Sequence, residues 1–388
     1  IGNGMSAFTQ TYINIPITLN QDEVDAAEAS FVKTSRYREI ITNALAAEVQ
    51  KGGFETELDE PDELRQILSS GAPATLREFV LANPQDVGQT ITFEFRTASR
   101  VDGYLKGRVS RESLAEDRNL SPQALDLVDQ LVSAGIVFSQ FNWNFITGTD
   151  ASDSRPEQAG MGVAMLGSLF MMLTVLILSL PIGVAASIYL EEFAPKNKLT
   201  DLIEVNISNL AAVPSIVFGI LGLAVFIQFM HLPQSAPLVG GLVLTLMTLP
   251  TIIISTRASL KAVPPSIRDA ALGVGASKMQ AVFHHVLPLA LPGILTGTII
   301  GLAQALGETA PLLLIGMVGF IASNYPDGVA AGFLDPNSAM PAQIYEWAKR
   351  ADPAFYERAW GGIIILLLFL MTMNIIAIIL RRRFERRW

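Results

Sequence analysis

The chain has 388 residues, half of them apolar, with a formal net charge of -9, three histidines and no cysteine. The absence of cysteine excludes a disulfide scaffold, a thiolate metal site and a cysteine nucleophile. Because three histidines offer no histidine-based metal cluster, we expect neither a metal site nor catalytic residues. Charge divides the sequence, since residues 1–158 carry 24 acidic and 13 basic side chains, whereas residues 159–388 carry 12 and 14. Two physically different regions are therefore expected.

Residues 1–158 are expected to form a small α+β domain. Alternating apolar residues predict strands at 11–19 and 89–97. Ser121-Pro122 provides a suitable cap and first residue for one of the expected helices. Helical patterns cover residues 21–50, 62–68, 75–81 and 121–134.

The second region is expected to cross a membrane repeatedly. Residues 148–160, rich in Asp, Ser, Gly and Pro, are expected to be the linker that leads into it. Core helices of a large soluble protein could imitate one apolar stretch, but several in succession, joined by polar turns, indicate an α-helical polytopic membrane protein. Five stretches approach the roughly 20 residues that a spanning helix needs, and they cover residues 161–190, 207–230, 237–255, 289–321 and 361–380.

Orientation follows from the excess of basic residues on the cytoplasmic side of membrane proteins. The tail after the last stretch begins with Arg381-Arg382-Arg383 and is expected to be cytoplasmic, which places 11 basic residues of the second region inside and three outside. An odd number of spans then places residues 1–158 outside, in the periplasm of a bacterium with two membranes. Because an outer domain needs a targeting segment, we expect that a further span before residue 1 was removed or is not included.

A polar, helix-like hairpin at residues 268–293 lies between the third and fourth apolar stretches. Ser266 is expected to cap its first helix, with Asp269 as the acid of a capping box. Gly275 permits a sharp bend between two short helices. Such a hairpin can press a compact knob into the groove of a partner protein, although an ordinary amphipathic loop helix remains the alternative.

The hairpin closely resembles the coupling loop of ABC-importer permeases. The acidic residue and two alanines of that loop correspond to Asp269, Ala270 and Ala271, and Gly275 stands at the matching glycine position. The resemblance therefore implies that residues up to Lys278 contact an ATPase subunit.

Two further runs narrow the resemblance. G-E-T-A-P-L at residues 307–312 is similar to the signature of phosphate-importer permeases of the PstA type, and P-S-I-V-F-G at residues 214–219 accompanies it. Together with the coupling loop, the resemblance covers residues 161–380. It implies a MetI-like ABC permease bundle in the bacterial inner (plasma) membrane. Residues 1–158 exceed the small loop of the shortest relatives and resemble an extended subset.

The resemblance implies that the chain is a permease subunit of an ATP-driven importer for inorganic phosphate, and not an enzyme. The sequence contains no G-x-x-x-x-G-K-[ST] motif, so ATP and Mg are expected on a separate ATPase and no cofactor on this chain. The implied partners are a second homologous permease, a dimer of ATP-binding subunits and a periplasmic phosphate-binding protein, with lipid around the spans and no nucleic acid. Closure of the ATPase dimer would push the coupling loop and rock the spans between two access states.

Glu308 is the candidate residue of the translocation path. A carboxyl at membrane depth is costly, so it should face the bundle interior or water and have a partner. Gln304 lies one turn earlier, and Thr309 can bond back to the backbone. Relatives often place one Arg just before this motif and another near the end of the preceding span. This chain has Gln304 at the first position, and its Arg257 lies about a turn later than the second family Arg. The predicted residues of the translocation path are therefore Glu308, Gln304, Thr309 and Arg257.

Repulsion between a phosphate dianion and an ionised Glu308 leaves three possibilities. A partner subunit supplies an Arg, Glu308 shares a proton with the anion, or Glu308 forms a bridge that opens during transport. The structural alternative is a polar clamp between helices.

Other functions remain open from the sequence. The chain could carry another oxyanion, such as sulfate or molybdate, or could be a secondary transporter or channel that works without ATP. A membrane-held sensor or scaffold is a third class. Residues 1–158 could dock a soluble binding protein, or could be a solubilising extension that shields the permease mouth or braces a partner.

Overall fold

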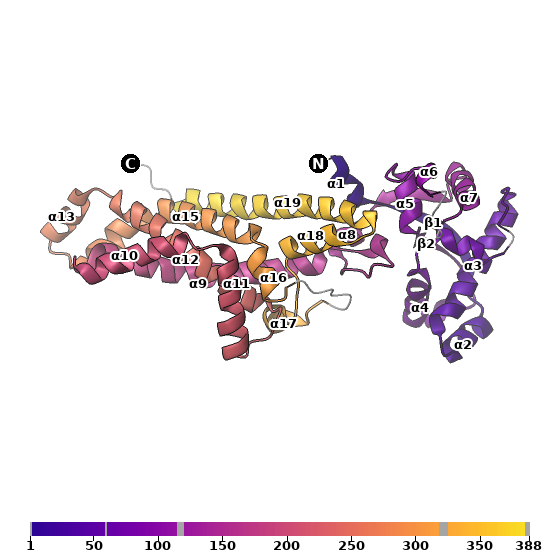
Figure 1. Ribbon diagram of the computed structural model, residues 1–388, viewed down its shortest axis with the longest axis horizontal. Coiled ribbons are helices and arrows are strands. Elements are labelled where there is room, and N and C mark those ends of the chain that lie inside the picture. The colour runs from indigo at the N-terminus through magenta and orange to yellow at the C-terminus, as the bar shows by residue number, and fades with distance from the viewer. Residues whose placement is uncertain (1, 59, 115–119, 318–324, 385–388) are drawn as a thin grey trace. The chain divides into compact units, whose positions relative to one another are not determined.

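A computed structural model describes residues 2–58, 60–114, 120–317 and 325–384 (Figure 1). The chain forms two compact units. The N-terminal unit comprises Ile1–Gly162 together with Trp347–Gly361, and the helical unit comprises Val163–Glu346 together with Gly362–Trp388. The return of Trp347–Gly361 to the first unit was not predicted, because the sequence analysis assigned that segment to the membrane region.

The N-terminal unit contains a three-stranded antiparallel sheet in the order β2-β1-β3. The predicted strands at 11–19 and 89–97 are confirmed as β1 (Thr9–Thr18) and β2 (Thr90–Arg96). In β1 the alternating residues Ile13, Ile15 and Ile17 are fully buried, which explains why the period of two was visible in the sequence. β3 (Val137–Phe141) was missed, since its five residues are too few to show a clear alternation.

Helices pack against the face of this sheet that carries Ile13, Ile15 and Ile17, and they differ from the predicted ones in two places. The expected helix at 21–50 is interrupted at Ser30–Val32, where the Phe31 side chain is fully exposed, and the pattern at 62–68 forms a 3-10 helix, Glu63–Ile67. The cap at Ser121 is confirmed, because its hydroxyl accepts the Ala124 N–H at 3.2 Å. The α-helices are α1 (Gly2–Met5), α2 (Gln21–Ala29), α3 (Lys33–Gly52), α4 (Ala72–Ala82), α5 (Ser99–Leu105), α6 (Arg111–Leu114), α7 (Pro122–Ser133) and α8 (Trp143–Thr147), with short 3-10 helices at Ser6–Phe8, Pro84–Asp86 and Pro156–Gln158.

Residues 148–160, expected to be a linker, are packed into the N-terminal unit. Asp150 accepts hydrogen bonds from the Trp347 indole at 2.8 Å and from Arg350 Nη2 at 2.7 Å. Glu157 is also buried, and burial raises the pKa of its carboxyl, while a hydrogen bond from Ser69 acts in the opposite direction. The segment leads directly into the apolar helix that begins at Gly162, but it is packed and not solvated, because turn-forming polar residues can also satisfy buried donors.

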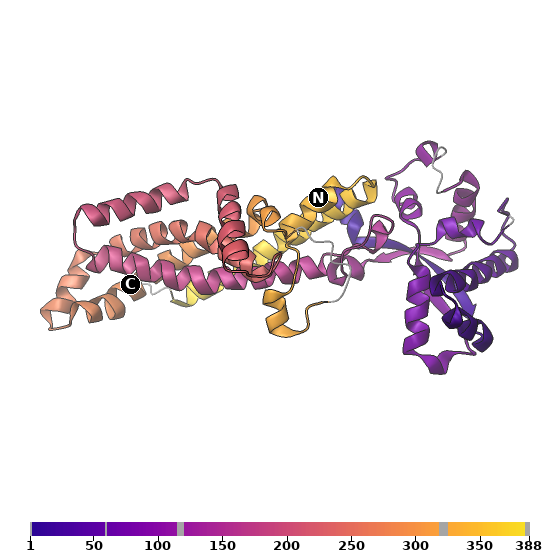
Figure 2. The same ribbon diagram turned by 60° about the horizontal axis from the view of Figure 1, so that its bottom comes forward.

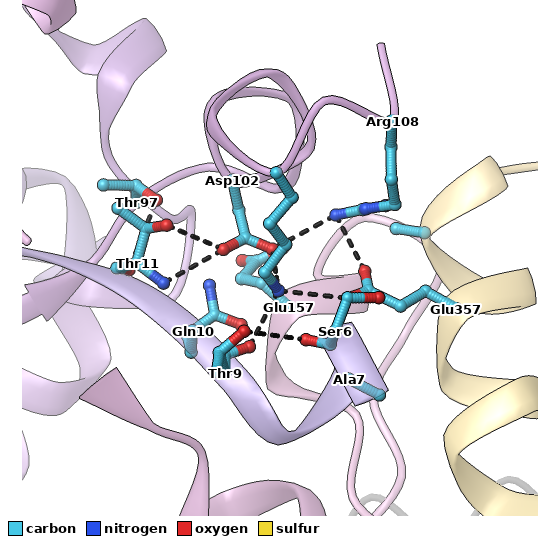
Figure 3. Close-up of polar contacts among 12 residues, drawn as sticks. Ser6, Ala7, Thr9, Gln10, Thr11, Thr97, Asp102, Arg108, Glu157 and Glu357 are labelled. Atoms are coloured by element: carbon cyan, nitrogen blue, oxygen red, sulfur yellow. Dashed lines mark hydrogen bonds and ion pairs between the residues drawn. The ribbon is translucent and has the colours of Figure 1, made fainter. Parts of the chain in front are cut away.

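A buried network of charges joins α5 to the first turns of α19 (Pro353–Phe384) inside this unit (Figure 3). Lys106 Nζ lies 2.7 Å from Asp102 Oδ2 and 3.0 Å from Glu357 Oε1. Arg108 Nη2 spans the same two carboxylates at 3.1 and 2.8 Å. Thr11 of β1 donates its N–H and hydroxyl to Asp102 Oδ1 at 3.0 and 2.9 Å. Two cations and two anions therefore alternate, so that each buried charge has a partner of opposite sign.

The helical unit consists of long apolar helices and short connecting ones. Within the described residues, four helices are long and apolar enough to cross a membrane, or five if a pair bent by 99° counts as one span. Its helices in chain order are α9 (Gly162–Ile188), α10 (Lys198–Ala211), α11 (Ser215–Gly222), α12 (Pro237–Lys261), α13 (Pro265–Gly273), α14 (Lys278–Ala281), α15 (Leu287–Gly307), α16 (Ala310–Leu314), α17 (Gly328–Leu334), most of α18 (Met340–Lys349) and the greater part of α19, with π-helical segments at Tyr189–Phe193, Leu223–Phe229 and Val282–Val286.

Two of the expected spans are not single helices. The stretch at 207–230 is the bent pair of α10 and α11 (Figure 1), which breaks just before Ser215 because Pro214 disfavours a helical conformation in the preceding residue. The stretch at 289–321 ends as a helix at Gly307, and the chain turns at Glu308 before α16 begins. The last residues of that expected span, 318–321, lie outside the described part of the chain.

Helices α12 and α15 lie side by side in both views (Figures 1 and 2). Three glycines of α15, one per turn, face α12: a side chain at Gly293 or Gly297 would collide with Ser259 or Ser255, and one at Gly301 would approach Thr248 within 2.9 Å. Small residues at this spacing let two helix backbones approach closely, as is common in membrane helix pairs. The pairing fixes the register between the two helices.

Candidate coupling and translocation site

The hairpin between α13 and α14 is closed by two successive capping motifs. Gly275, at φ +92°, donates its N–H to the Leu272 carbonyl at 2.9 Å, and Ala276 donates to the Ala271 carbonyl at 3.1 Å. These two bonds form a Schellman motif, which needs a residue with positive φ and therefore favours glycine. The bend predicted at Gly275 is confirmed.

The predicted cap at Ser266 was wrong. α13 starts at Pro265, its N-cap position is Pro264, and it has no side-chain cap. Because the two prolines preset the first turn, Ser266 and Asp269 lie inside the helix. A capping box does exist in the hairpin, but at the start of α14, where Ser277 accepts the Gln280 N–H at 3.3 Å and its own N–H donates to Gln280 Oε1 at 2.8 Å.

The inner face of the hairpin is anchored by apolar burial. Ala271 of α13 is buried, and so are Val282 and Val286 in the π-helical segment before α15. The two valines pack in one cluster with Leu260 at the end of α12 and Ile188 at the end of α9. The hairpin is therefore attached to three long helices at once.

Ion pairs reinforce this anchoring. Arg268 of α13 donates from Nη2 to Glu192 Oε1 at 2.6 Å, and it also donates to the carbonyls of Leu260 and Val263 at 2.9 and 2.8 Å, where α12 ends. A cation at the C-terminus of a helix is favourable because carbonyls there lack helical partners. Glu192 carries no sequence signal of this role, since a carboxylate at the end of an apolar stretch resembles an ordinary interfacial residue.

Arg257, predicted to line the translocation path, lies in the same end of the unit. Its Nη2 is 2.6 Å from Glu204 Oε1 and its Nε is 3.3 Å from Glu191 Oε2. Adjacent carboxylates of one π-helical segment, Glu191 and Glu192, thus each bind one arginine. The arrangement connects α9, α10, α12 and α13 near the hairpin.

The outer face of the hairpin is exposed. Asp269, Ala270, Gly275 and Lys278 are all on this face, and the Lys278 ammonium lies 5.3 Å from the centre of the Phe193 ring. Between the polar residues the hairpin presents apolar side chains that sequence reasoning missed, with Val274 at its tip 86% exposed. The other exposed apolar residues of the hairpin are Leu272, Met279 and Phe283. Apolar residues within an otherwise polar segment are the sequence signal that could have revealed them.

Glu308 lies at the opposite end of α15. Its backbone is extended (φ -77°, ψ 127°), its side chain is half-buried, and within the described residues no ion pair or hydrogen bond holds the carboxylate. Gln304, in the last turn of α15, is exposed, and Thr309 is half-buried in the break before α16. Three of the four predicted path residues therefore occur together at an interruption of the helix.

The P-S-I-V-F-G and G-E-T-A-P-L runs, which resemble those of phosphate-importer permeases, meet beside this break. A Cβ at Gly219 would lie 2.7 Å from the Pro311 Cα, so α11 crosses α16 with almost no space between their backbones. Gly219 ends the P-S-I-V-F-G run, and Pro311 belongs to the G-E-T-A-P-L run. A larger residue at position 219 would displace the segment that carries Glu308.

The structure does not bring Arg257 to Glu308. Gly297 of α15 faces Ser255, two residues before Arg257, whereas Glu308 lies 11 residues beyond Gly297. At 1.5 Å per helical residue, that separation along α15 is about 16 Å. Arg257 therefore belongs with the hairpin end, and Glu308 with the far end of the helix.

The two regions of the chain match two different protein families. Residues 179–388 match the family described as "Binding-protein-dependent transport system inner membrane component", and residues 1–115 match a domain of unknown function, DUF3333. The chain is 30% identical to "Phosphate transport system permease protein PstA 1" of Mycobacterium tuberculosis over 60% of its own length and 74% of that protein. It is 31% identical to the PstA permease of Mycobacterium leprae, covering 60% and 74%.

A further relative is the probable ABC transporter permease YqgI of Bacillus subtilis, at 28% identity over 62% of this chain and 83% of that protein. Members of this family are transport components of the inner membrane, not enzymes, and they work with ATPase and substrate-binding partners. The chain belongs to the binding-protein-dependent transport inner-membrane components and is, within them, an ABC permease of the PstA type.

Proposed function

We propose that this chain is a membrane permease subunit of an ATP-driven importer for inorganic phosphate, and that residues 269–278 of its hairpin receive the movement of a separate ATPase. The observation that carries the proposal is the construction of the hairpin. Its inner face is held by apolar packing and by Arg268, while its outer face exposes an apolar tip at Val274. A segment that is rigidly attached inside and apolar outside is suited to transmit force from a docked protein.

The anion path is proposed to pass the break at Glu308. Interrupted helices at membrane depth place unpaired backbone groups and polar side chains beside a pathway. Because the described residues provide no cation beside the carboxylate, a second, homologous permease is proposed to contribute one. Arg257, already bonded to two glutamates, is proposed to help couple the hairpin to α9 and α10 and not to hold the anion at Glu308.

The proposed orientation places the hairpin and C-terminal tail in the cytoplasm and the N-terminal unit in the periplasm. The distribution of 11 and three basic residues supports it. The N-terminal unit is proposed to lie where a phosphate-binding protein docks, and the ATP and Mg are proposed to reside on the ATPase subunits.

The test is phosphate uptake and ATP hydrolysis by the complete complex in proteoliposomes, with Val274→Asp beside wild type. We expect the variant to lose stimulation of ATPase by the binding protein, and uptake, because a charge at the apolar tip opposes docking of the ATPase. Lys261→Ala is the matched control, since Lys261 is exposed near the hairpin but not at its tip.

Three results would contradict the proposal. Uptake by wild type without ATP would favour a secondary transporter. Stronger competition by sulfate or molybdate than by unlabelled phosphate would favour a permease for another oxyanion. Normal coupling in Val274→Asp would remove the hairpin from the ATPase interface.

A further inference from the structure

An apolar crevice of about 250 Å³ opens between α9, α15 and α19 in the helical unit. Among the described side chains that line it, only Thr298 and Asn374 are polar. The Thr298 hydroxyl is already used, because it donates to the Ile294 carbonyl at 2.9 Å. The crevice therefore suits a hydrocarbon occupant and disfavours water or a free anion.

The lining residues show that the crevice runs along the helices. α9 contributes Met172, Leu176 and Leu180, one residue per turn, and α19 contributes residues from Leu370 to Leu380. Ten helical residues correspond to about 15 Å. This length is half the roughly 30 Å thickness of the hydrocarbon core of a bilayer, so the crevice matches one acyl chain of one leaflet.

A cation stands at the end of the crevice. Arg381 follows Leu380 and lies one turn after Ala377, so it continues the face of α19 that lines the crevice. Its Nη1 donates to the Thr296 hydroxyl at 3.2 Å, and Thr296 is next to the lining residue Leu295. A guanidinium has five N–H donors in a planar fork, so one bond to Thr296 orients the group and leaves donors for an anion.

We propose that this crevice binds one anionic phospholipid, with an acyl chain between α9, α15 and α19 and its phosphate on Arg381. The apolar lining recognises the chain, and the arginine selects a head group with net negative charge. A free phosphate ion would gain the arginine contact but would not fill the crevice. A zwitterionic lipid would fill the crevice but would gain less from the cation.

The experiment is native mass spectrometry of the complete complex after exchange in nanodiscs that contain equal amounts of phosphatidylglycerol and phosphatidylcholine. Wild type is expected to retain one phosphatidylglycerol more, per copy of this chain, than Ala377→Trp, in which the indole fills the crevice. Ile378→Trp is the matched control, because this neighbouring residue is 42% exposed and does not line the crevice. It should retain the lipid.

The arginine is tested separately with the crevice intact. Arg381→Gln is expected to reduce the preference for phosphatidylglycerol over phosphatidylcholine about fivefold, the effect of one basic residue near an anionic surface. Arg383→Gln should leave the preference unchanged, because Arg383 is exposed and lies about half a turn around the helix from Arg381.

A photocrosslinker at Ala377 identifies the occupant even if a tryptophan variant does not assemble. Crosslinks to lipid support the proposal. It is overturned by crosslinks to a protein segment, by equal retention in Ala377→Trp and Ile378→Trp, or by equal amounts of the two lipids on wild type.

Discussion

Arg358 donates from Nη2 to Gln10 Oε1 at 2.8 Å, although 348 residues separate them along the chain. The guanidinium is 1% exposed, donates further to the carbonyls of Ala7 and Glu157 at 3.1 and 3.2 Å, and lies 5.3 Å from the centre of the Phe145 ring. Neutral oxygens and an aromatic face thus bind this charge directly. The first turns of α19 are an integral part of the N-terminal unit.

Arg358→Ala should therefore destabilise that unit. Truncation removes the donor of the Gln10 and Glu157 oxygens, leaves the Ala7 carbonyl with the longer bond from the Asn142 amide at 3.4 Å, and opens a cavity. The expected loss in the free energy of unfolding is therefore about 3 kcal/mol. Hydrogen exchange of the β1 amides in the full-length chain measures it. Arg36→Ala, which removes a solvent-exposed pair with Glu39, is the control, and it should change the free energy of unfolding obtained from exchange by less than about 0.5 kcal/mol. Similar effects of both variants would refute the structural role of Arg358.

A pH-dependent contribution is expected from Glu28. Arg77 donates from Nε to Glu28 Oε1 at 2.7 Å and from Nη2 to Oε2 at 3.1 Å, and together with Lys33 these bonds lower the pKa of Glu28 from 4.5 to about 2. Because the folded pKa is below the unfolded one, the stabilisation is complete above about pH 4.5 and is lost as pH falls toward 2.

Glu28→Gln should consequently lower the free energy of unfolding by about 1 kcal/mol at pH 7, a value limited by partial exposure of the pair. The difference from wild type should shrink as the pH approaches 2. Thermal unfolding of both full-length proteins between pH 7 and 2.5 measures it, with Glu39→Gln as control. A difference that does not depend on pH would show that packing, not ionisation, accounts for the effect.

Two glycines of the hairpin, Gly275 and Gly273, allow a variant and its matched control. Gly275→Ala should lower the free energy of unfolding by about 1 kcal/mol, since the φ of +92° at this position is unfavourable for a residue with a Cβ. Gly273→Ala should be neutral or slightly stabilising, because Gly273 is helical and a Cβ there meets nothing within 4 Å. Thermal unfolding of the complex and stimulated ATPase activity distinguish them; equal loss in both variants would argue against a specific need for the Schellman bend.

Glu308→Gln should abolish phosphate uptake while leaving assembly of the complex intact. The substitution keeps the size and removes the charge, so a path that depends on ionisation or on a bridge to a partner cation fails. Gln304→Glu in the same background, which returns a carboxylate one turn earlier, should restore little. If Glu308→Gln supports both uptake and ATPase coupling, the residue is a polar clamp and the path lies elsewhere.

The sequence predicted those features that depend on periodicity or on local backbone chemistry. The alternation of Ile13, Ile15 and Ile17 revealed β1, Ser121 revealed a helix start, and Gly275 revealed a bend. These signals are carried by a few neighbouring residues, so no tertiary information was required.

Features that depend on distant contacts were not predictable. Asp150 looked like a linker residue until Trp347 and Arg350 supplied its partners. Arg257 looked like a candidate for the anion path, and only the folded chain shows Glu191 and Glu204 beside it. The role of these polar residues depends on partners far away in sequence, and the amino-acid sequence alone does not reveal those partners.

The position of Glu357 in the buried network also constrains the order of folding. Asp102, Lys106 and Arg108 are synthesised long before Glu357, and residues 163–346 with their apolar helices come between. Until the late segment arrives, Lys106 and Arg108 share Asp102 as their acidic partner in this network, and the early part of the unit retains an imbalance of charge. Final packing of the N-terminal unit must therefore follow synthesis of the intervening helices, so a nascent chain that stalls within them would leave this unit incomplete.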